Sequence, residues 1–246
     1  MERIQKVMAR AGVASRRHCE AMIAAGMVKI NGRVVTEPGT KVDPDKDKIQ
    51  VGGETLRLSP QKYYLLMYKP RGYITTMSDE KGRKQVTDLL KGITARVYPV
   101  GRLDYDSEGL LLLTNDGELT FALTHPSHLV PKTYLVRVEG VPAKEQLEQM
   151  SAGLNLEDGP TGPAKVRLVG QHDGNGLVEV TIREGRNRQI RRMFDHIGYR
   201  VLRLKRSKLG DLGLETMRPG EYRHLSESEV KQLKVLAGLK PGTGKQ

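Results

Sequence analysis

Three carboxylates lie close together near the middle of the chain, at Asp104, Asp106 and Glu108. They occupy a turn-rich stretch that leads directly into an apolar run at residues 110–113, which predicts a buried strand. Loops that enter rigid strands commonly carry functional residues. An ionised carboxylate in such a loop can act as a nucleophile or as a general base. Because acidic loops are more often simply solvated, the local pattern permits catalysis without establishing it.

A second group of candidate residues is basic and lies at residues 187–197. Apolar side chains recur there at the spacing of one helical face, which leaves arginines on the other faces. The apolar residues are Ile190, Met193, Phe194 and Ile197, and the arginines are Arg188, Arg191 and Arg192. Guanidinium groups pair with carboxylates and with phosphates. The predicted helix therefore offers partners for a carboxylate or for a polyanion.

The charge of the whole chain narrows the class of partner. Of 246 residues, 41 are Lys or Arg and 29 are Asp or Glu, which gives a formal net charge of +12. This excess favours nucleic acid or an acidic membrane. A transmembrane protein is excluded because the longest apolar runs, residues 63–68 and 110–113, are far shorter than the ~20 residues of a spanning helix. A membrane-surface protein is disfavoured because the chain has no Trp and only two Phe as anchors.

The ends of the chain and its single cysteine point to a simple cytoplasmic protein. Basic residues interrupt the N-terminal segment, which therefore does not read as a secretory signal. Cys19 alone cannot form an internal disulfide or a multi-cysteine metal site, and its apolar neighbours predict that it packs inertly. Residues 239–246 are predicted to be a disordered tail.

Residues 1–60 are predicted to form a small α/β domain. Apolar residues at helical spacing predict two short helices, the second with Ser15 as its N-cap. Asn31-Gly32 between two β-branched runs predicts a hairpin. Arg16 and Arg17 open the second helix and oppose its macrodipole, which favours an anion bound there. An ordinary solvated basic face is the alternative.

Residues 61–238 are predicted to form a larger α+β domain in which strands alternate with some helices. Ser226 and Glu229 have the spacing of a capping box for a last helix. The predicted strands lie at residues 63–68, 109–113, 132–138, 177–183 and 200–204.

Two N-terminal stretches resemble the S4-type RNA-binding domain. They are Ala11-Gly12-Val13-Ala14-Ser15-Arg16-Arg17 and the segment from Ala25 to Gly32. The resemblance covers nearly the whole of the small domain. It implies docking on structured RNA through shape and phosphate contacts.

Four elements of the larger domain resemble the motifs of RNA pseudouridine synthases, and they occur in the order of that family. They are Lys69-Pro70-Arg71-Gly72, Gly101-Arg102-Leu103-Asp104 followed by Ser107-x-Gly-Leu-Leu, Lys132-Thr133-Tyr134, and residues 184–194. With the S4-like domain, they point to the subgroup that modifies ribosomal RNA, and the resemblance spans residues 1 to about 235. It implies a mixed, largely antiparallel central sheet flanked by helices.

The resemblance also implies a cofactor-free reaction. Conversion of uridine to pseudouridine breaks the C1′–N1 bond and joins C5 to C1′, so mass balance requires no redox agent, metal or nucleotide. Asp104 is the expected catalytic carboxylate, either attacking C1′ or removing a proton from C2′. Arg191 is expected to keep that carboxylate charged and oriented, and Tyr134 to stack on the uracil.

Further contacts are expected from the cleft and from the basic surface. Arg102 is placed to fill the gap that the flipped base leaves, with a structural salt bridge as the alternative. Relatives often carry His at the position of Arg188, so we expect that arginine to face RNA without a catalytic role. Expected substrate-binding residues are Arg102, Leu204, Arg186, Arg192 and Lys69, and expected RNA-binding residues are Arg3, Lys6, Arg10, Ser15, Arg16, Arg17, Lys29, Arg33 and Arg188.

The substrate expected from overall resemblance is 23S ribosomal RNA, with 16S ribosomal RNA as the alternative, either free or within an assembling subunit. A monomer is expected because no apolar association stripe is evident. A non-catalytic assembly factor that binds ribosomal RNA is the main rival, and its binding would not depend on Asp104. An N-glycosylase is a second rival, and it would release free uracil.

Overall fold

The computed structural model describes residues 1–58 and 61–239 of the chain. It divides into two compact units, one comprising Met1–Tyr63 with the short segments Thr94–Arg96 and Asn115–Gly117, and the other the remaining residues. Both units combine helices with strands, which confirms the predicted α+β class. Residues 240–246 of the predicted tail lie outside the described part, whereas Leu239 packs partly buried against the core of the larger unit.

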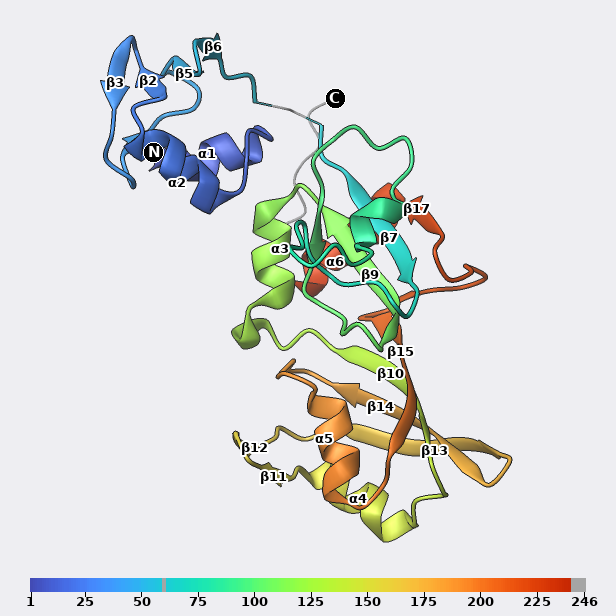
Figure 1. Cartoon of the computed structure of the whole chain (residues 1–246). Helices are drawn as coiled ribbons and strands as arrows, with labels where there is room; N and C mark the ends of the chain where they lie inside the picture. The colour runs from blue at the N-terminus through green and yellow to red at the C-terminus, as the bar shows by residue number, and fades with distance from the viewer. Residues whose placement is uncertain (59–60, 240–246) are drawn as a thin grey trace. The chain divides into compact units, whose positions relative to one another are not determined.

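The smaller unit packs two helices on a small antiparallel sheet (Figure 1). Ser15 caps the second helix, because its hydroxyl accepts a hydrogen bond from the backbone N of His18 at 3.2 Å. The predicted hairpin is confirmed, and both residues of its turn, Asn31 and Gly32, have positive φ. Its elements are β1 (Glu2–Arg3), α1 (Ile4–Arg10), α2 (Arg16–Ala24), β2 (Val28–Ile30), β3 (Arg33–Val35), β4 (Lys41–Val42), β5 (Ile49–Val51) and β6 (Glu54–Thr55).

The cations of the smaller unit fall into two groups. Lys6 and Arg10 both form ion pairs with Glu2, at 2.9 and 2.7 Å. A second set is exposed, and its side chains make no hydrogen bond or ion pair with any residue that the structure describes. That set is Arg3, Arg16, Arg17, Lys29 and Arg33.

The larger unit is organised around one long mixed sheet with the order β13-β14-β10-β15-β9-β7-β17. All neighbouring pairs are antiparallel except β15 and β9, which pair in parallel. Residues 110–113 of β9 are fully buried on both faces, as expected for an uninterrupted apolar strand. The strands are β7 (Tyr64–Lys69), β8 (Tyr98–Val100), β9 (Glu108–Thr114), β10 (Lys132–Val138), β11 (Asn155–Leu156), β12 (Gly159–Pro160), β13 (Lys165–His172), β14 (Asn175–Ile182), β15 (Val201–Leu209), β16 (Leu212–Gly213) and β17 (Tyr222–His224).

Helices cover the sheet at both ends (Figure 1). α3 and α6 bury apolar residues against β7 and β9, whereas α4 and α5 lie beside β13 and β15. Ser226 and Glu229 form the predicted capping box of α6. No helix in the described part of the chain is both long and apolar enough to span a membrane. The helical elements are η1 (Val86–Leu89), α3 (Gly117–Thr124), η2 (Pro126–His128), α4 (Lys144–Ala152), α5 (Gln189–His196) and α6 (Glu227–Leu236).

Candidate active site

Asp104 lies in the turn that connects β8 to β9, and this turn is held by its own backbone carbonyls. Each of the five consecutive carbonyl oxygens of residues 103–107 accepts a hydrogen bond. The donors outside the turn are Thr75 Oγ1, Lys69 Nζ, Gly72 N and Arg191 Nη2. A turn with every carbonyl paired is rigid, so the Asp104 side chain projects from a fixed backbone.

Lys69 holds this turn through hydrogen bonds from its ammonium group. Its side chain is fully buried, and its three N–H groups donate to the carbonyl oxygens of Pro70, Asp104 and Ser107 at 3.1, 2.9 and 2.7 Å. Burial lowers the pKa of Lys69 to about 8, although the carboxylates of Asp104 and Asp106 oppose that shift. Because all its donors are used, Lys69 has no donor left for a substrate, which differs from the substrate contact expected from the motif.

A cavity of about 380 Å³ opens beside the turn. This volume lies in the range of small-molecule sites, ~300–1,000 Å³. Six of the residues expected to catalyse or to bind substrate and RNA line it, namely Asp104, Tyr134, Arg102, Leu204, Arg186 and Arg188. Among the expected residues of the larger unit, Lys69, Arg191 and Arg192 do not line it.

The guanidinium group nearest to Asp104 belongs to Arg188. Its Nη1 lies 3.8 Å from Asp104 Oδ2 and 3.5 Å from Asp106 Oδ1. Arg188 caps α5 in the left-handed conformation, with φ of 47°, which aims its side chain back toward the turn. Arg191 is buried and pairs with Asp106 at 3.0 Å, rather than with Asp104 as expected. Arg188 thus makes the direct contact to Asp104, and Arg191 is connected to that residue only through the neighbouring Asp106.

Two further cations, Arg206 and Lys132, line the cavity. Arg206 is buried in β15, and its Nε donates to the carbonyl oxygen of Leu110 at 2.7 Å. Lys132, at the start of β10, donates to the carbonyl oxygen of Val130 at 3.0 Å. Burial, followed by the charge of Arg206, lowers the pKa of Lys132. The sequence assigned no role to Lys132 beyond its place in a motif, although its position two residues before Tyr134 puts both on one face of a strand.

Arg102 is exposed at the cavity and forms no hydrogen bond or ion pair with a residue that the structure describes. The alternative of a salt bridge across the turn therefore receives no support. Ser107 also lines the cavity, and its buried hydroxyl has no hydrogen-bond partner in the described part of the chain. The exposed Arg102 guanidinium therefore remains open to a ligand, whereas the Ser107 hydroxyl is enclosed by protein.

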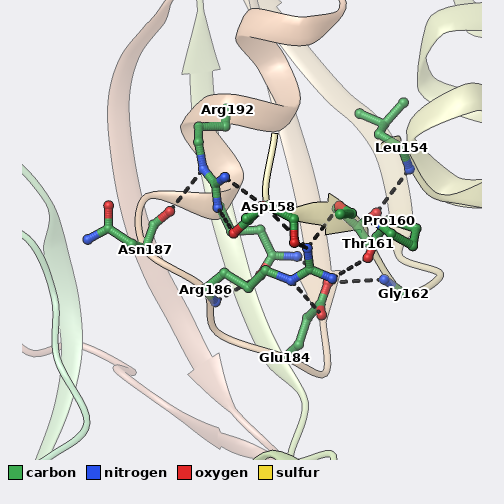
Figure 2. Close-up of polar contacts among 11 residues, drawn as sticks. Leu154, Asp158, Pro160, Thr161, Gly162, Glu184, Arg186, Asn187 and Arg192 are labelled. Atoms are coloured by element: carbon green, nitrogen blue, oxygen red, sulfur yellow. Dashed lines mark hydrogen bonds and ion pairs between the residues drawn. The ribbon is translucent and has the colours of Figure 1, made fainter. Parts of the chain in front are cut away.

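Arg186 and Arg192 converge on Asp158, in the turn between β11 and β12 (Figure 2). Arg192 binds both carboxylate oxygens at 2.8 Å, and Arg186 binds the carboxylate at 3.3 Å and the carbonyl oxygens of Gly159 and Pro160. These pairs lower the pKa of Asp158 to about 2, with the hydrogen bond from Arg192 as the largest cause. Both arginines are therefore engaged within the protein, unlike the free substrate-binding groups expected. We name the group of Asp158, Arg186 and Arg192 the hairpin clasp.

His125 was not expected at the site, yet it lines the cavity from the segment between α3 and η2. The available signal was weak, because a single histidine after a helix is usually part of an ordinary turn. Its position follows from the packing of α3 through Leu119, Ala122 and Leu123 in the core. This packing carries the end of α3 to the edge of the cavity.

Comparison with known proteins agrees with this geometry. Residues 63–196 match the family model described as RNA pseudouridylate synthase, and residues 2–54 match the S4 domain. The chain is 50% identical over 239 residues to ribosomal large subunit pseudouridine synthase B of Bacillus subtilis (strain 168), covering 96% of this chain and 97% of that protein. It is 44% identical over 240 residues to an uncharacterized RNA pseudouridine synthase of Aquifex aeolicus (strain VF5), covering 97% and 96%.

A solved structure extends the agreement to three dimensions. A crystal structure of a pseudouridylate synthase matches with a TM-score of 0.68 at 32% identity, covering 95% of this chain and 100% of that chain. The resemblance seen in four short motifs is thereby confirmed over almost the whole chain. The chain belongs to the RNA pseudouridine synthase family, whose members are isomerases that convert uridine to pseudouridine in RNA.

Proposed function

We propose that this protein isomerises one uridine of large-subunit ribosomal RNA to pseudouridine, with Asp104 as the catalytic carboxylate. The observation that carries this proposal is the rigid turn that holds Asp104 at a cavity also lined by Tyr134 and Leu204. The choice of ribosomal RNA of the large subunit is supported by the printed activity of the Bacillus subtilis relative. The S4 domain match and the net charge of +12 support a structured RNA substrate.

The reaction can be assigned to residues at the cavity. The Asp104 carboxylate attacks C1′ or removes a proton from C2′, and either path breaks the C1′–N1 bond. The uracil then turns, C5 joins C1′, and the hydrogen lost from C5 is replaced by one gained at N1, so the product has the atoms of the substrate. Tyr134 stacks on the uracil and Leu204 gives it an apolar wall.

Three arginines have different roles in the proposed reaction, which follow from their different contacts. The Arg188 guanidinium, whose Nη1 lies 3.8 Å from Asp104 Oδ2, is the cation closest to that carboxylate. In our proposal Arg191 acts as a positioning residue, because it holds the turn through the carboxylate and the carbonyl oxygen of Asp106. Arg102 is free to occupy the stack from which the uridine is flipped.

The deciding experiment is a nucleotide-resolution map of pseudouridine in both ribosomal RNAs from cells that lack the protein. The same cells are then supplied with the intact chain, with Asp104→Asn, or with Asp211→Asn as a control for loss of one carboxylate. Asp211 is exposed and does not line the cavity. We expect one 23S site to disappear in the deletion and to return with the intact chain and with Asp211→Asn only.

Other outcomes separate the alternatives. Loss of a 16S site would move the substrate to the small subunit. An unchanged map would contradict the proposal and favour a non-catalytic ribosomal RNA-binding factor. Restoration by Asp104→Asn would remove Asp104 from its proposed role.

A further inference from the structure

An aromatic cluster that the proposed reaction does not use lies beside the cavity. It comprises Phe121 of α3, His125, and His128 of η2. The ring centroids of Phe121 and His125 are 4.8 Å apart, and those of His125 and His128 are 6.1 Å apart in an edge-on arrangement. Because His125 also lines the cavity, the cluster is continuous with the candidate active site.

Phe121 is placed where packing does not require an aromatic residue. Its neighbours Leu119, Ala122 and Leu123 enter the core, whereas Phe121 is 60% exposed. The other phenylalanine of the chain, Phe194, is fully buried. An exposed ring beside a functional cavity is therefore available to a ligand.

Hydrogen bonds fix both histidine rings. His125 Nδ1 accepts from the backbone N of Ser127 at 3.3 Å and lies 2.7 Å from its hydroxyl. A neutral His125 then carries its proton on Nε2, as a donor. His128 Nδ1 lies 2.9 Å from the carbonyl oxygen of Ala237. Rings that are already held lose little conformational freedom when a ligand stacks on them.

A cation stands next to this cluster. Arg183 lines the cavity, and its Nη1 donates to the carbonyl oxygen of Leu129, directly after η2, at 3.3 Å. Arg183 is exposed. An aromatic face with an adjacent guanidinium suits a nucleotide, whose base stacks while its phosphate meets the charge.

We propose that Phe121 and His125 form a stacking site for the base of an RNA nucleotide that flanks the target uridine, with Arg183 at its phosphate. The inference rests on the proposed function for the identity of the target uridine. It does not rest on that function for the binding of RNA. The site determines which sequence context around the uridine is accepted.

The test measures binding of an unmodified 23S ribosomal RNA transcript by filter retention, in the Asp104→Asn background so that the RNA is not converted. Phe121→Ala should weaken binding by about tenfold, in line with the loss of one base–aromatic stack. Phe121→Trp should restore it. Leu168→Ala is the matched control, because Leu168 is also exposed, at 41%, but lies on β13 and does not line the cavity.

Salt dependence distinguishes stacking from charge. The slope of log affinity against log salt should not change in Phe121→Ala, whereas Arg183→Gln should make it shallower by about one unit. Phe121→Ala that binds like the parent protein would overturn the stacking site. Equal losses in Phe121→Ala and Leu168→Ala would also overturn it, because the effect would then not be local.

Pseudouridine formation in the same transcript is a second measurement, and it distinguishes failure of the stacking site from failure of the proposed enzymatic function. Pseudouridine formation by the intact protein tests the proposed function. If no pseudouridine forms but Phe121→Ala still loses binding and Phe121→Trp regains it, the enzyme proposal fails and the stacking site stands as an RNA contact. If pseudouridine forms equally well with Phe121→Ala at limiting RNA, the stacking site is rejected and the enzyme proposal stands.

Discussion

At the residue scale, the ammonium group of Lys69 holds the turn that carries Asp104. An ammonium group has three N–H donors, and in this structure three carbonyl oxygens accept them. A neutral amine has only two. Deprotonation therefore leaves one carbonyl of the turn without its partner.

We predict that kcat falls as the pH rises through about 8, the pKa to which burial lowers Lys69. Single-turnover rates between pH 6.5 and 9.5 measure this limb. In Lys69→Arg, provided that circular dichroism shows a folded protein, the limb should be absent because the guanidinium stays charged. A wild-type rate that is constant up to pH 9.5 would contradict the prediction.

The free energy of unfolding should increase with pH over the range in which kcat falls. Because the folded pKa of Lys69 is lowered, the unfolded chain binds more protons between about pH 8 and the ordinary lysine pKa of 10.5. The contribution of Lys69 to the free energy of unfolding therefore increases with pH in that window. A protein that becomes more stable against unfolding while its turnover becomes slower would identify Lys69 as a positioning residue.

Motif resemblance predicted which side chains gather at one cavity. It was less informative about the hydrogen-bond and ion-pair partners of each side chain. Asp104, Tyr134 and Leu204 come from three separate elements and line one cavity. The pairing of Arg191 with Asp106 and the left-handed backbone at Arg188 are not revealed by any spacing in the sequence. Lys69 was expected at the substrate because the motif does not tell a buried lysine from an exposed one.

At the scale of elements, the hairpin clasp connects β11–β12 to the loop that precedes α5. Residues 184–188 of that loop line the cavity, as does Gln189, the first residue of α5. Glu184 adds to this connection, since its Oε1 accepts from the backbone N of Gly162 at 3.0 Å (Figure 2). The same oxygen accepts from Gln189 Nε2 at 2.5 Å. The clasp thus holds one wall of the cavity in place.

We predict that Asp158→Asn lowers kcat and at the same time tightens RNA binding. The wall becomes looser, and two guanidinium groups are released to meet phosphates, so the salt slope should become steeper by up to about two units. Glu157→Gln is the matched control, because it removes the same charge from the adjacent exposed position. Equal effects of the two substitutions would show that only net charge matters.

Gly109 controls the parallel contact between β9 and β15. Its φ is 113°, and a Cβ atom there would lie 2.3 Å from the backbone oxygen of Arg206. We predict that Gly109→Ala lowers the free energy of unfolding by at least about 2 kcal/mol. Gly170→Ala, in β13, has nothing within 4 Å of the added Cβ and should change stability by less than about 1 kcal/mol. Urea denaturation of both variants measures the difference.

Sequence patterns predicted elements well where burial was strong and poorly where it was not. β9 and α5 have the periodicity expected of a buried strand and an amphipathic helix, and both form. β13 was missed because most of its residues are exposed and its polar–apolar alternation stops after Leu168, where the register shifts. The hairpin of β11 and β12 has strands of only two residues, which leave almost no periodic signal, so the partner of Arg186 and Arg192 could not be foreseen.

For the whole molecule, RNA binding combines a catalytic unit with a basic S4 unit on one chain. Two modules on one chain raise affinity through effective concentration. We predict that the double variant Arg16→Gln/Arg17→Gln lowers affinity for a 23S transcript and makes the salt slope shallower by up to about two units. Filter binding at several salt concentrations measures both.

The smaller unit provides its own control for this prediction. Lys6→Gln/Arg10→Gln removes the same charge, but these two side chains already pair with Glu2. Their loss should change the slope less than loss of the unpaired Arg16 and Arg17. The reverse order would show that the second helix does not contact phosphate.

The left-handed backbone at Arg188 has a consequence for laboratory evolution of this enzyme. A long L side chain at φ of 47° is conformationally strained, whereas Gly and Asn adopt that region readily. A library selected only for heat resistance should therefore become enriched in Gly or Asn at position 188, with a gain of roughly 1 kcal/mol per clone. The same library selected for pseudouridine formation should keep the arginine, since its guanidinium is the one nearest to Asp104. Thermal stability and the rate of pseudouridine formation would then favour different residues at position 188.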